Sequence, residues 1–385
     1  MTTRLPRWFA LLVLALPFVP VAAAAPDDAE IARLVKQLGD DDFDKREAAT
    51  ARLKEIGEPA LDAVTKAARS RDPEVRLRAE DIITDYREPR LIGHSVLTIV
   101  VSPDGRRLLT GGFDKTLRLW DADTGKELRV FEGHTDAILA VALSPDGKRV
   151  LSASGDLVRL WDAETGKELR QMTHGPGNGA ASVAFGPEGQ ALSGDRAGRM
   201  HLWDLNTGKK AGVFTCPHPE GRVVSTVAYS EKAKLAVTSG SHQPICLWNL
   251  EPGKEVRKLA ESDYAQVCFS PDGKRLAGIF NELLRIWDVE TGKVLFGIDG
   301  VKAFCVAFSP DGKRLVTGGR EKMQVWDANG KELHKYEGHT GSVGCVMFFP
   351  DGKRIASANF DGVGNPVDRP GPPSPDSVRI WRAPR

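Results

Sequence analysis

The sequence predicts a mainly β fold, a seven-bladed β-propeller, preceded by a small all-α segment. Three observations lead to this prediction. A unit of about 40 residues recurs along most of the chain, and each copy ends its third predicted strand with a Trp, usually followed by Asp. Each copy alternates apolar and polar residues between turns rich in Gly and Pro, which is typical of short antiparallel strands. The residues before the first copy have helical spacing instead.

Residues 1–24 are expected to be a secretory signal peptide. Arg4 and Arg7 supply a positive start, an apolar run follows from Trp8 to Val21, and small residues precede a cleavage point after Ala24. The alternative is an uncleaved membrane anchor. Two prolines and the short run disfavour it, since a spanning helix needs about 20 apolar residues. We therefore expect an exported protein, in the periplasm or outside the cell, with no membrane insertion after cleavage.

Residues 25–86 are expected to form about four helices that include an internal repeat. The repeated positions are Asp42, Arg46, Ala49 and Leu53, which match Asp72, Arg76, Ala79 and Ile83. Gly and Pro residues within the segment mark the expected ends of the helices. This pattern resembles HEAT-like helical hairpins, which stack through their apolar faces. A plain helical bundle is the alternative.

Residues 87–385 are expected to form the propeller. The marker tryptophans are Trp120, Trp161, Trp203, Trp248, Trp287, Trp326 and Trp381. A period near 40 residues indicates a stacked or radial array. Each copy has room for four strands, but only four residues follow the last marker. We expect residues 87–92 to supply the missing outer strand, so that the two ends of the array close the ring and leave no free sheet edge.

Three short motifs recur in the copies: Gly-His before the first strand, Ser-Pro-Asp-Gly in the first hairpin and Trp-Asp at the end of the third strand. The Ser-Pro-Asp-Gly turn is intact at Ser102, Ser144, Ser270 and Ser309, and altered at Gly186, Ser230 and Phe349. With these motifs the sequence resembles the WD-repeat β-propellers over roughly residues 88–385. The resemblance implies a rigid ring whose loops contact other proteins.

The resemblance also implies a hydrogen-bonded network of His, Ser or Thr, Asp and Trp within a blade. The expected members are His94, Asp114 and Trp120 in the first copy, His134, Ser154, Asp156 and Trp161 in the second, and His339, Asp361 and Trp381 in the last. Gly112 is expected to replace the hydroxyl residue in the first copy. Because these His–Asp pairs repeat around the ring, we interpret them as structural and not as catalytic.

Composition and motif searches give no catalytic, cofactor or metal site. The formal net charge of +1 gives no indication of a nucleic-acid partner. Five cysteines are an odd number, and they are expected to be small packing residues. No CxxC, HExxH, GxSxG or phosphate-loop motif occurs. His218 and His242 could approach one another but have no evident third ligand, and His201 is interpreted as a strand side chain. We therefore expect no cofactor.

The last copy contains an insertion, residues 362–377, rich in Pro and Gly. It is either a partner-binding loop or a tolerated surface insertion. By analogy with the family, the expected contact residues near the channel mouth are Phe113, Asp136, Phe360, Asp361, Asp368 and Arg369.

These observations predict an exported, non-catalytic scaffold that binds other proteins or peptides through loops on one propeller face, most simply as a monomer. One alternative is a propeller enzyme, hydrolytic or metal-dependent, with its site in the central channel. The apolar or small residues of the inner-strand segments argue against it. The other alternative is an envelope assembly factor. Both rest on fold-level analogy, because a fold by itself does not determine function.

Overall fold

The computed structural model describes residues 28–56, 60–87, 90–91, 96–215, 223–240, 243–251, 253–261, 266–280, 282–360 and 378–384. The chain divides into two compact units, Met1–Ile83 and Thr84–Arg385. Among the helices of the described ranges, none combines the length and the apolar character needed to cross a membrane. The expected signal peptide, residues 1–24, lies outside these ranges.

The first unit contains four helices, α1 (Asp28–Gln37), α2 (Phe43–Ile56), α3 (Leu61–Ala67) and α4 (Pro73–Arg87), the last of which runs on into the second unit. Their apolar faces bury one core that includes Leu38, Leu53 and Val64. Asp42 and Asp72 precede α2 and α4, and their carboxylates accept backbone N–H groups of the first helical turn. This capping explains why Asp recurs at these two positions.

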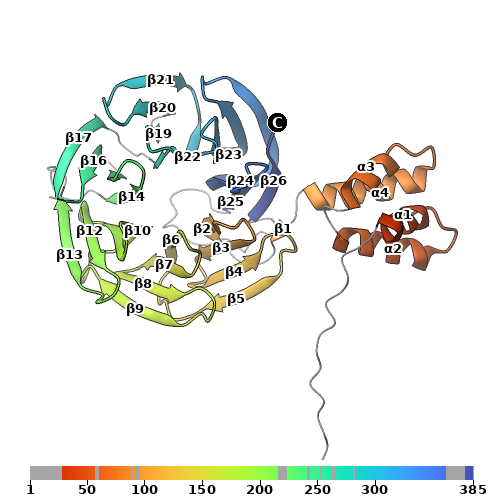
Figure 1. Ribbon diagram of the computed structural model, residues 1–385, viewed down its shortest axis with the longest axis horizontal. Coiled ribbons are helices and arrows are strands. Elements are labelled where there is room, and N and C mark those ends of the chain that lie inside the picture. The colour runs from red at the N-terminus through yellow and green to blue at the C-terminus, as the bar shows by residue number, and fades with distance from the viewer. Residues whose placement is uncertain are drawn as a thin grey trace, which may run out of the picture. The chain divides into compact units, whose positions relative to one another are not determined.

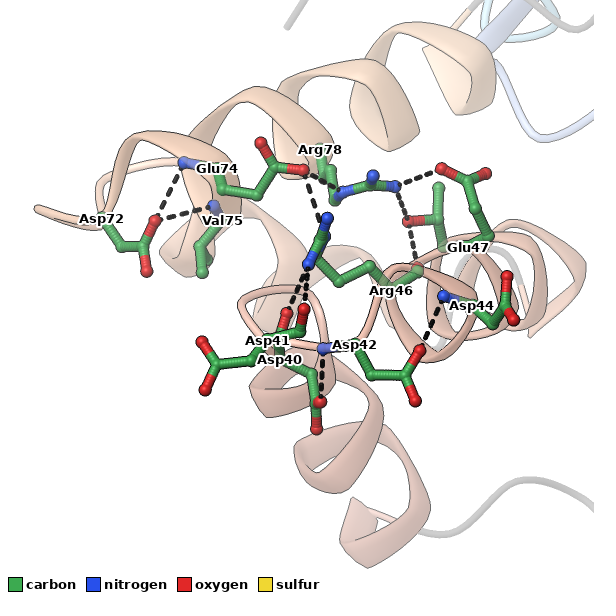
Figure 2. Close-up of polar contacts among 11 residues, drawn as sticks. Asp40, Asp41, Asp42, Asp44, Arg46, Glu47, Asp72, Glu74, Val75 and Arg78 are labelled. Carbon is green, nitrogen blue, oxygen red and sulfur yellow. Dashed lines mark hydrogen bonds and ion pairs between the residues drawn. The ribbon is translucent and has the colours of Figure 1, made fainter.

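The repeated arginines of this unit, Arg46 and Arg76, stabilise the turns between helices, and Figure 2 shows the contacts of Arg46. Nη1 of Arg46 donates to the carbonyl of Asp40 at 2.7 Å, and Nη1 of Arg76 donates to the carbonyl of Ser70 at 3.3 Å. Arg78 joins the two halves, because its guanidinium donates to Glu74 on its own helix and to Glu47 on α2. The internal repeat therefore reflects two turns stabilised in the same way.

The second unit consists of antiparallel sheets arranged as a ring, with the first strand of each repeat innermost and the fourth outermost (Figure 1). Five sheets have four strands in sequence order. Their strands are β2 (Val96–Val101), β3 (Arg107–Gly112), β4 (Leu117–Asp121) and β5 (Glu127–Phe131); β6 (Ile138–Leu143), β7 (Arg149–Ser154), β8 (Leu157–Asp162) and β9 (Glu168–Thr173); β10 (Ala180–Phe185), β11 (Gln190–Asp195), β12 (Arg199–Asp204) and β13 (Lys210–Thr215); β14 (Val224–Ser230), β15 (Leu235–Gly240), β16 (Gln243–Asn249) and β17 (Lys254–Glu261); and β18 (Gln266–Phe269), β19 (Arg275–Phe280), β20 (Leu283–Asp288) and β21 (Val294–Asp299).

The sixth sheet has six strands: β1 (Arg90–Leu91), β26 (Val378–Arg382), β25 (Arg354–Phe360), β24 (Glu332–Phe348), β23 (Arg314–Asp327) and β22 (Ala303–Phe308). Its two long strands change partners part-way along. Residues 314–319 of β23 pair with β22, and residues 322–326 pair with residues 332–337 of β24. Residues 342–348 of β24 then pair with β25. The register therefore divides this sheet into two successive sets of strands.

The two ends of the propeller meet in this sheet. Arg90 pairs with Arg379 and Leu91 pairs with Val378, so β1 is the neighbour of β26. These two residues fall within the 87–92 segment that we expected to complete the last repeat. The backbone of the first residues of the unit thus lies beside its last strand.

A β-bulge recurs at the same position of the outer strands. In six pairs of third and fourth strands the register shifts beside the marker Trp, which leaves one residue of the outer strand unpaired in a β-bulge. The unpaired residue is Ala211 in the third repeat, and in the other five pairs it is a large apolar residue between 39 and 51 % exposed: Leu128, Leu169, Val256, Leu295 and Leu333. A bulge re-aims a side chain and twists a free sheet edge. These exposed apolar residues are therefore a consequence of edge geometry.

Candidate functional site

One end of the ring carries a second set of β-bulges, on the inner strands. The pairing of the first and second strands skips the second residue of six inner strands. The skipped residues are Leu97, Leu139, Ala181, Ser225, Phe304 and Gly344. We call this set, with the loops that adjoin it at the same strand ends, the rim. Bulges of this kind often re-aim side chains at barrel rims and binding sites.

Phe304 distinguishes the rim from the rest of the propeller. Its side chain is 38 % exposed, and every other exposed large apolar residue among the described part of the propeller lies on an outer strand. The neighbouring rim residues Lys302 and Arg320 are exposed and flank it, because Ala303 pairs with Gly319. Phe304 was not among the contact residues expected from the sequence. Its signal was an aromatic residue where the other repeats carry Leu, Ala, Ser or Gly.

Two of the expected contact residues adjoin the rim. Asp136 is exposed in the loop that leads into β6, and half-buried Phe113 follows β3, whose last residue pairs with the first residue of β2. Phe360 is the last residue of β25 and pairs with Ser342, and its side chain lies outside the described part. Asp361, Asp368, Arg369 and the 362–377 insertion also lie outside the described residues.

A hydroxyl group accepts the indole N–H of the marker Trp in six repeats. The donor–acceptor pairs are Trp120–Thr110 at 2.9 Å, Trp161–Ser152 at 2.8 Å, Trp203–Ser193 at 2.7 Å, Trp248–Thr238 at 2.8 Å, Trp326–Thr317 at 3.0 Å and Trp381–Ser357 at 2.6 Å. The second and last repeats add the expected His: Nε2 of His134 lies 2.7 Å from Ser152 Oγ, and Nε2 of His339 lies 2.7 Å from Ser357 Oγ.

The expected positions of the hydroxyl and the carboxylate in this network were wrong. In the second repeat the hydroxyl belongs to Ser152, not Ser154. Val150 lies opposite Trp161, so Ser152 is the diagonal neighbour of the indole and Ser154 lies about 7 Å further along the strand. Ser154 instead donates to the carbonyl of Asp136 at 2.7 Å. Asp156 accepts the N–H of Gly177 and does not contact His134.

The hydroxyl of the first repeat needs the same correction, whereas the expected role of Asp114 beside His94 stays a prediction because His94 lies outside the described residues. Thr110 supplies the hydroxyl, two residues before Gly112, so the repeat does not lack one. Asp114 accepts hydrogen bonds from Thr116 and Arg118, which places it in the turn between β3 and β4. His94 and Asp361 lie outside the described residues, so their expected roles stay predictions.

The third repeat contains a buried polar cluster that was not expected from the sequence. His174, His201 and Trp203 stack, with ring centroids 4.4 Å apart for the two imidazoles and 5.6 Å for each imidazole to the indole. Nε2 of His174 lies 2.7 Å from Ser193 Oγ, and its Nδ1 lies 3.1 Å from the carbonyl oxygen of Asn178. His201 was expected to be an ordinary strand residue, and it is instead a central member of this cluster.

Asp195 organises the polar side of the cluster. Its fully buried carboxylate accepts the backbone N–H groups of Ala197 and Arg199, the Nε–H of Arg199 and a ring nitrogen of His201, all at 2.8–2.9 Å. Burial alone would raise the pKa of Asp195. The hydrogen bonds from His201 and Arg199 outweigh it and lower the pKa to about 2. The carboxylate is therefore ionised at neutral pH.

The cluster differs from the equivalent part of the second repeat at several positions that contact one another. There Arg159 occupies the place of His201, lies over Trp161 and pairs with Glu168 at 2.5 Å. The guanidinium fits because residue 133 is glycine, where a Cβ would lie 2.7 Å from Arg159 Nη1. The corresponding residues of the third repeat are Thr173 in place of Gly133 and Lys210 in place of Glu168, with Lys210 over Trp203.

Among the described residues, His174, Asp195 and His201 form the one group of three side chains whose potential metal-binding atoms lie within 4.8 Å of one another. Their arrangement does not suit a metal ion. Both nitrogens of His174 and all the hydrogen-bonding capacity of Asp195 are engaged within the protein. The two imidazoles are nearly parallel, at 15°, so their in-plane lone pairs cannot converge on one ion. His218 and His242 lie outside the described residues.

The cysteines of the described part are free thiols. Cys246 and Cys305 are buried, and Cys268 and Cys345 are half-buried on inner strands. Burial raises the pKa of Cys268 to about 12 and that of Cys305 well above its usual value. Because the thiolate is the reactive form, these groups are poor nucleophiles at neutral pH.

Comparisons with known proteins identify repeats of the same kind. Residues 87–121, 125–162 and 330–363 match the family model described as WD domain, G-beta repeat. Residues 199–343 match the model described as eukaryotic translation initiation factor eIF2A. The chain therefore contains WD40 repeats. Together with the mainly β structure, these matches support a WD-repeat β-propeller.

Three curated proteins are similar to short stretches of the chain. The small ribosomal subunit protein RACK1 of Drosophila melanogaster is 46 % identical over 54 residues, 14 % of this chain and 17 % of that protein. The U3 snoRNP-associated protein-like YAO of Arabidopsis thaliana is 43 % identical over 54 residues, 14 % and 11 % of the two chains. The nuclear distribution protein PAC1 of Coccidioides posadasii is 38 % identical over 74 residues, 19 % and 15 %. The chain thus covers less than a fifth of each of these relatives.

Proposed function

We propose that the protein is a non-catalytic scaffold that binds another protein or a peptide at the rim. The observation that carries this proposal is the exposed aromatic ring of Phe304 on a bulged inner strand, flanked by exposed Lys302 and Arg320. Aromatic residues and arginine are the side chains that most often dominate binding energy in protein interfaces. The similarity to RACK1 and PAC1 over single stretches supports a scaffold of the WD-repeat kind.

The ring of this scaffold is proposed to have seven blades. The five four-stranded sheets supply five of them. The change of partners along β23 and β24 divides the six-stranded sheet into two more, the second completed by β1. This division agrees with seven marker tryptophans in the sequence.

We also propose that the mature protein begins after Ala24 and acts as a monomer outside the cytoplasm. The positive start, apolar run and small residues of 1–24 support export. The helical unit is proposed to be a HEAT-like pair of hairpins, since Arg46 and Arg76 stabilise equivalent turns. An envelope assembly factor would be a scaffold of the same kind with a membrane-associated partner. A propeller enzyme has less support, because the polar cluster of the third repeat is buried and both His174 and Asp195 are engaged in hydrogen bonds within the protein.

Affinity capture with a matched pair of variants tests the scaffold. The mature protein would be crosslinked in its own compartment, beside Phe304→Asp and Leu169→Asp. The two positions have nearly equal exposure, 38 and 39 %, but Leu169 lies on an outer strand. We expect one partner to be captured by the unaltered protein and by Leu169→Asp, and lost with Phe304→Asp. Equal capture by all three would refute the rim as the binding surface.

A further inference from the structure

The hydrogen bonds around His174 determine its charge. The carbonyl oxygen of Asn178 can only accept, so Nδ1 of His174 carries a hydrogen. Trp203 donates its indole N–H to Ser193 Oγ, and the Ser193 hydroxyl lies 2.7 Å from Nε2 of His174. When Nε2 is unprotonated, the hydroxyl donates to it and every group has a partner. The imidazole is therefore neutral in this arrangement.

Protonation of His174 at its second ring nitrogen would be unfavourable in this arrangement. The Ser193 hydroxyl would lose its acceptor at a side chain that is fully buried. The positive ring would also lie 4.4 Å from the ring of His201. Burial, together with the neighbouring His201 and Lys210, lowers the pKa of His174 to about 4, although Asn178 and Asp195 act in the opposite direction. Arg199, which pairs with Asp195, adds another fixed cation to the cluster.

The same imidazole holds a loop of the rim. Residues 173–179 connect β9 to β10, and Pro176 and Gly177 at the tip are exposed. The loop is fixed by His174 Nδ1 on the Asn178 carbonyl, and by Asp156, which accepts the N–H of Gly177 at 3.2 Å and that of His174 at 3.1 Å. Asp156 belongs to the preceding repeat. The His174 ring therefore supplies one of the contacts that position the loop, beside Asp156 and the backbone bond from the N–H of Arg196 to the carbonyl of Gly179.

We propose that His174 is an acid-sensitive latch of the 173–179 loop. In its neutral form the ring holds the loop against the third repeat, and uptake of a second proton drives the ring out of the stack and releases the loop. His134 provides an internal comparison. Its ring bonds Ser152, but no loop carbonyl, so acid is not expected to release the 132–137 loop in the same way.

Spin labelling of the mature protein tests this latch without any partner, so the outcome is independent of the proposed binding function. A nitroxide would be attached at Pro176→Cys or, as the matched control, at Asp136→Cys, both with Cys216→Ser. Spectra would be recorded from pH 7.5 to about 3, with circular dichroism to follow the fold and ¹³C-labelled histidine to follow the His174 ring.

We expect the label at 176 to become several-fold more mobile in acid. The midpoint of this change should coincide with the midpoint of the His174 ring titration and precede any loss of fold. The label at 136 should not show this transition, and His174→Gln should remove it. The latch is refuted if mobility at 176 stays constant, changes only with global unfolding, or changes in the same way in His174→Gln. If His174→Gln does not fold, the test uses the protein with the native His174. There the latch is refuted if the midpoint of the mobility change at 176 differs by more than about one pH unit from the midpoint of the His174 ring titration.

Discussion

Arg354 and Gly105, which are 249 residues apart, are joined by a hydrogen bond of 3.2 Å from Nη2 to the carbonyl oxygen. The same bond joins neighbouring repeats elsewhere, from Arg107 to Gly147, from Arg275 to Gly312 and from Arg314 to Gly352. In each case an arginine after the first hairpin of one repeat reaches the equivalent hairpin of the next. The last repeat therefore contacts the first as these three repeats contact their neighbours, which adds to the β1–β26 pairing.

Arg354→Ala should destabilise the propeller more than Arg107→Ala. Arg354 also bonds Asp123 at 2.6 Å and lies over Phe349, with 4.2 Å from Cζ to the ring centroid. Its loss removes contacts at the junction of the two chain ends, and we expect a cost of about 2–3 kcal/mol. The Arg107 bond is longer, at 3.4 Å, and about 1 kcal/mol is expected. Urea unfolding measures both, and equal costs would contradict a special role for the junction.

Ser152→Ala should cost about 2–4 kcal/mol, because it leaves the indole N–H of Trp161 and Nε2 of His134 without a partner in a buried site. Ser154→Ala removes one bond to a carbonyl, and about 1 kcal/mol is expected. Each variant removes one serine hydroxyl from β7. The difference between their free energies of unfolding, measured by heat or urea, therefore reports the contribution of the network. A larger effect at 154 would show that the hydroxyl has been misplaced.

Gly278→Ser should destabilise the fifth repeat, although it introduces a hydroxyl where the other repeats have one. A Cβ at this position would lie 2.9 Å from Cζ3 of Trp287, closer than real contacts allow. The tryptophan there stacks on Phe280 instead of bonding a hydroxyl. We expect a loss of about 1–3 kcal/mol, as in other overpacked cores. A gain in stability would mean that Trp287 can readopt the common arrangement.

Stability should fall as the pH drops from about 6.5 to about 4. Burial lowers the pKa values of His134 and His174 from 6.5 to about 4, so the unfolded chain binds more protons than the folded one over this interval. The stabilisation is complete above pH 6.5, and its loss amounts to about 3 kcal/mol for each histidine. Urea titrations at several pH values measure it. A flat profile, or the same profile in a His134→Gln, His174→Gln double variant, would contradict the assignment.

Asp195→Asn should cost about 3–5 kcal/mol at neutral pH, because it leaves Arg199 and His201 beside a neutral group in a buried site. Asp204→Asn is the matched control in the same repeat. Asp204 is a turn residue whose carboxylate accepts backbone N–H groups, a role that Asn can fulfil. We expect a much smaller loss of stability there. Comparable losses for the two variants would show that the cluster adds little.

The sequence indicated the repeats and the strands because their signals are local. Period-2 alternation, Asp-Gly turns and a Trp about every 40 residues need no tertiary information. The position of the hydroxyl needed the strand register, which decides that Ser152 and not Ser154 reaches Trp161. His201 was missed because its role depends on three replacements at once, Thr173, His201 and Lys210, on three separate strands. Phe304 was missed because a bulge, and not the strand alternation, exposes it.

Site-specific photocrosslinking from the two ends of one strand tests the central claim, that binding occurs at the rim. A benzophenone amino acid would replace Asp136, just before β6, or Lys148, in the turn that follows β6, both exposed. The account predicts a crosslinked partner from position 136, suppressed by Phe304→Asp, and none from position 148. A crosslink from 148 alone, or one from 136 that Phe304→Asp leaves unchanged, would contradict it.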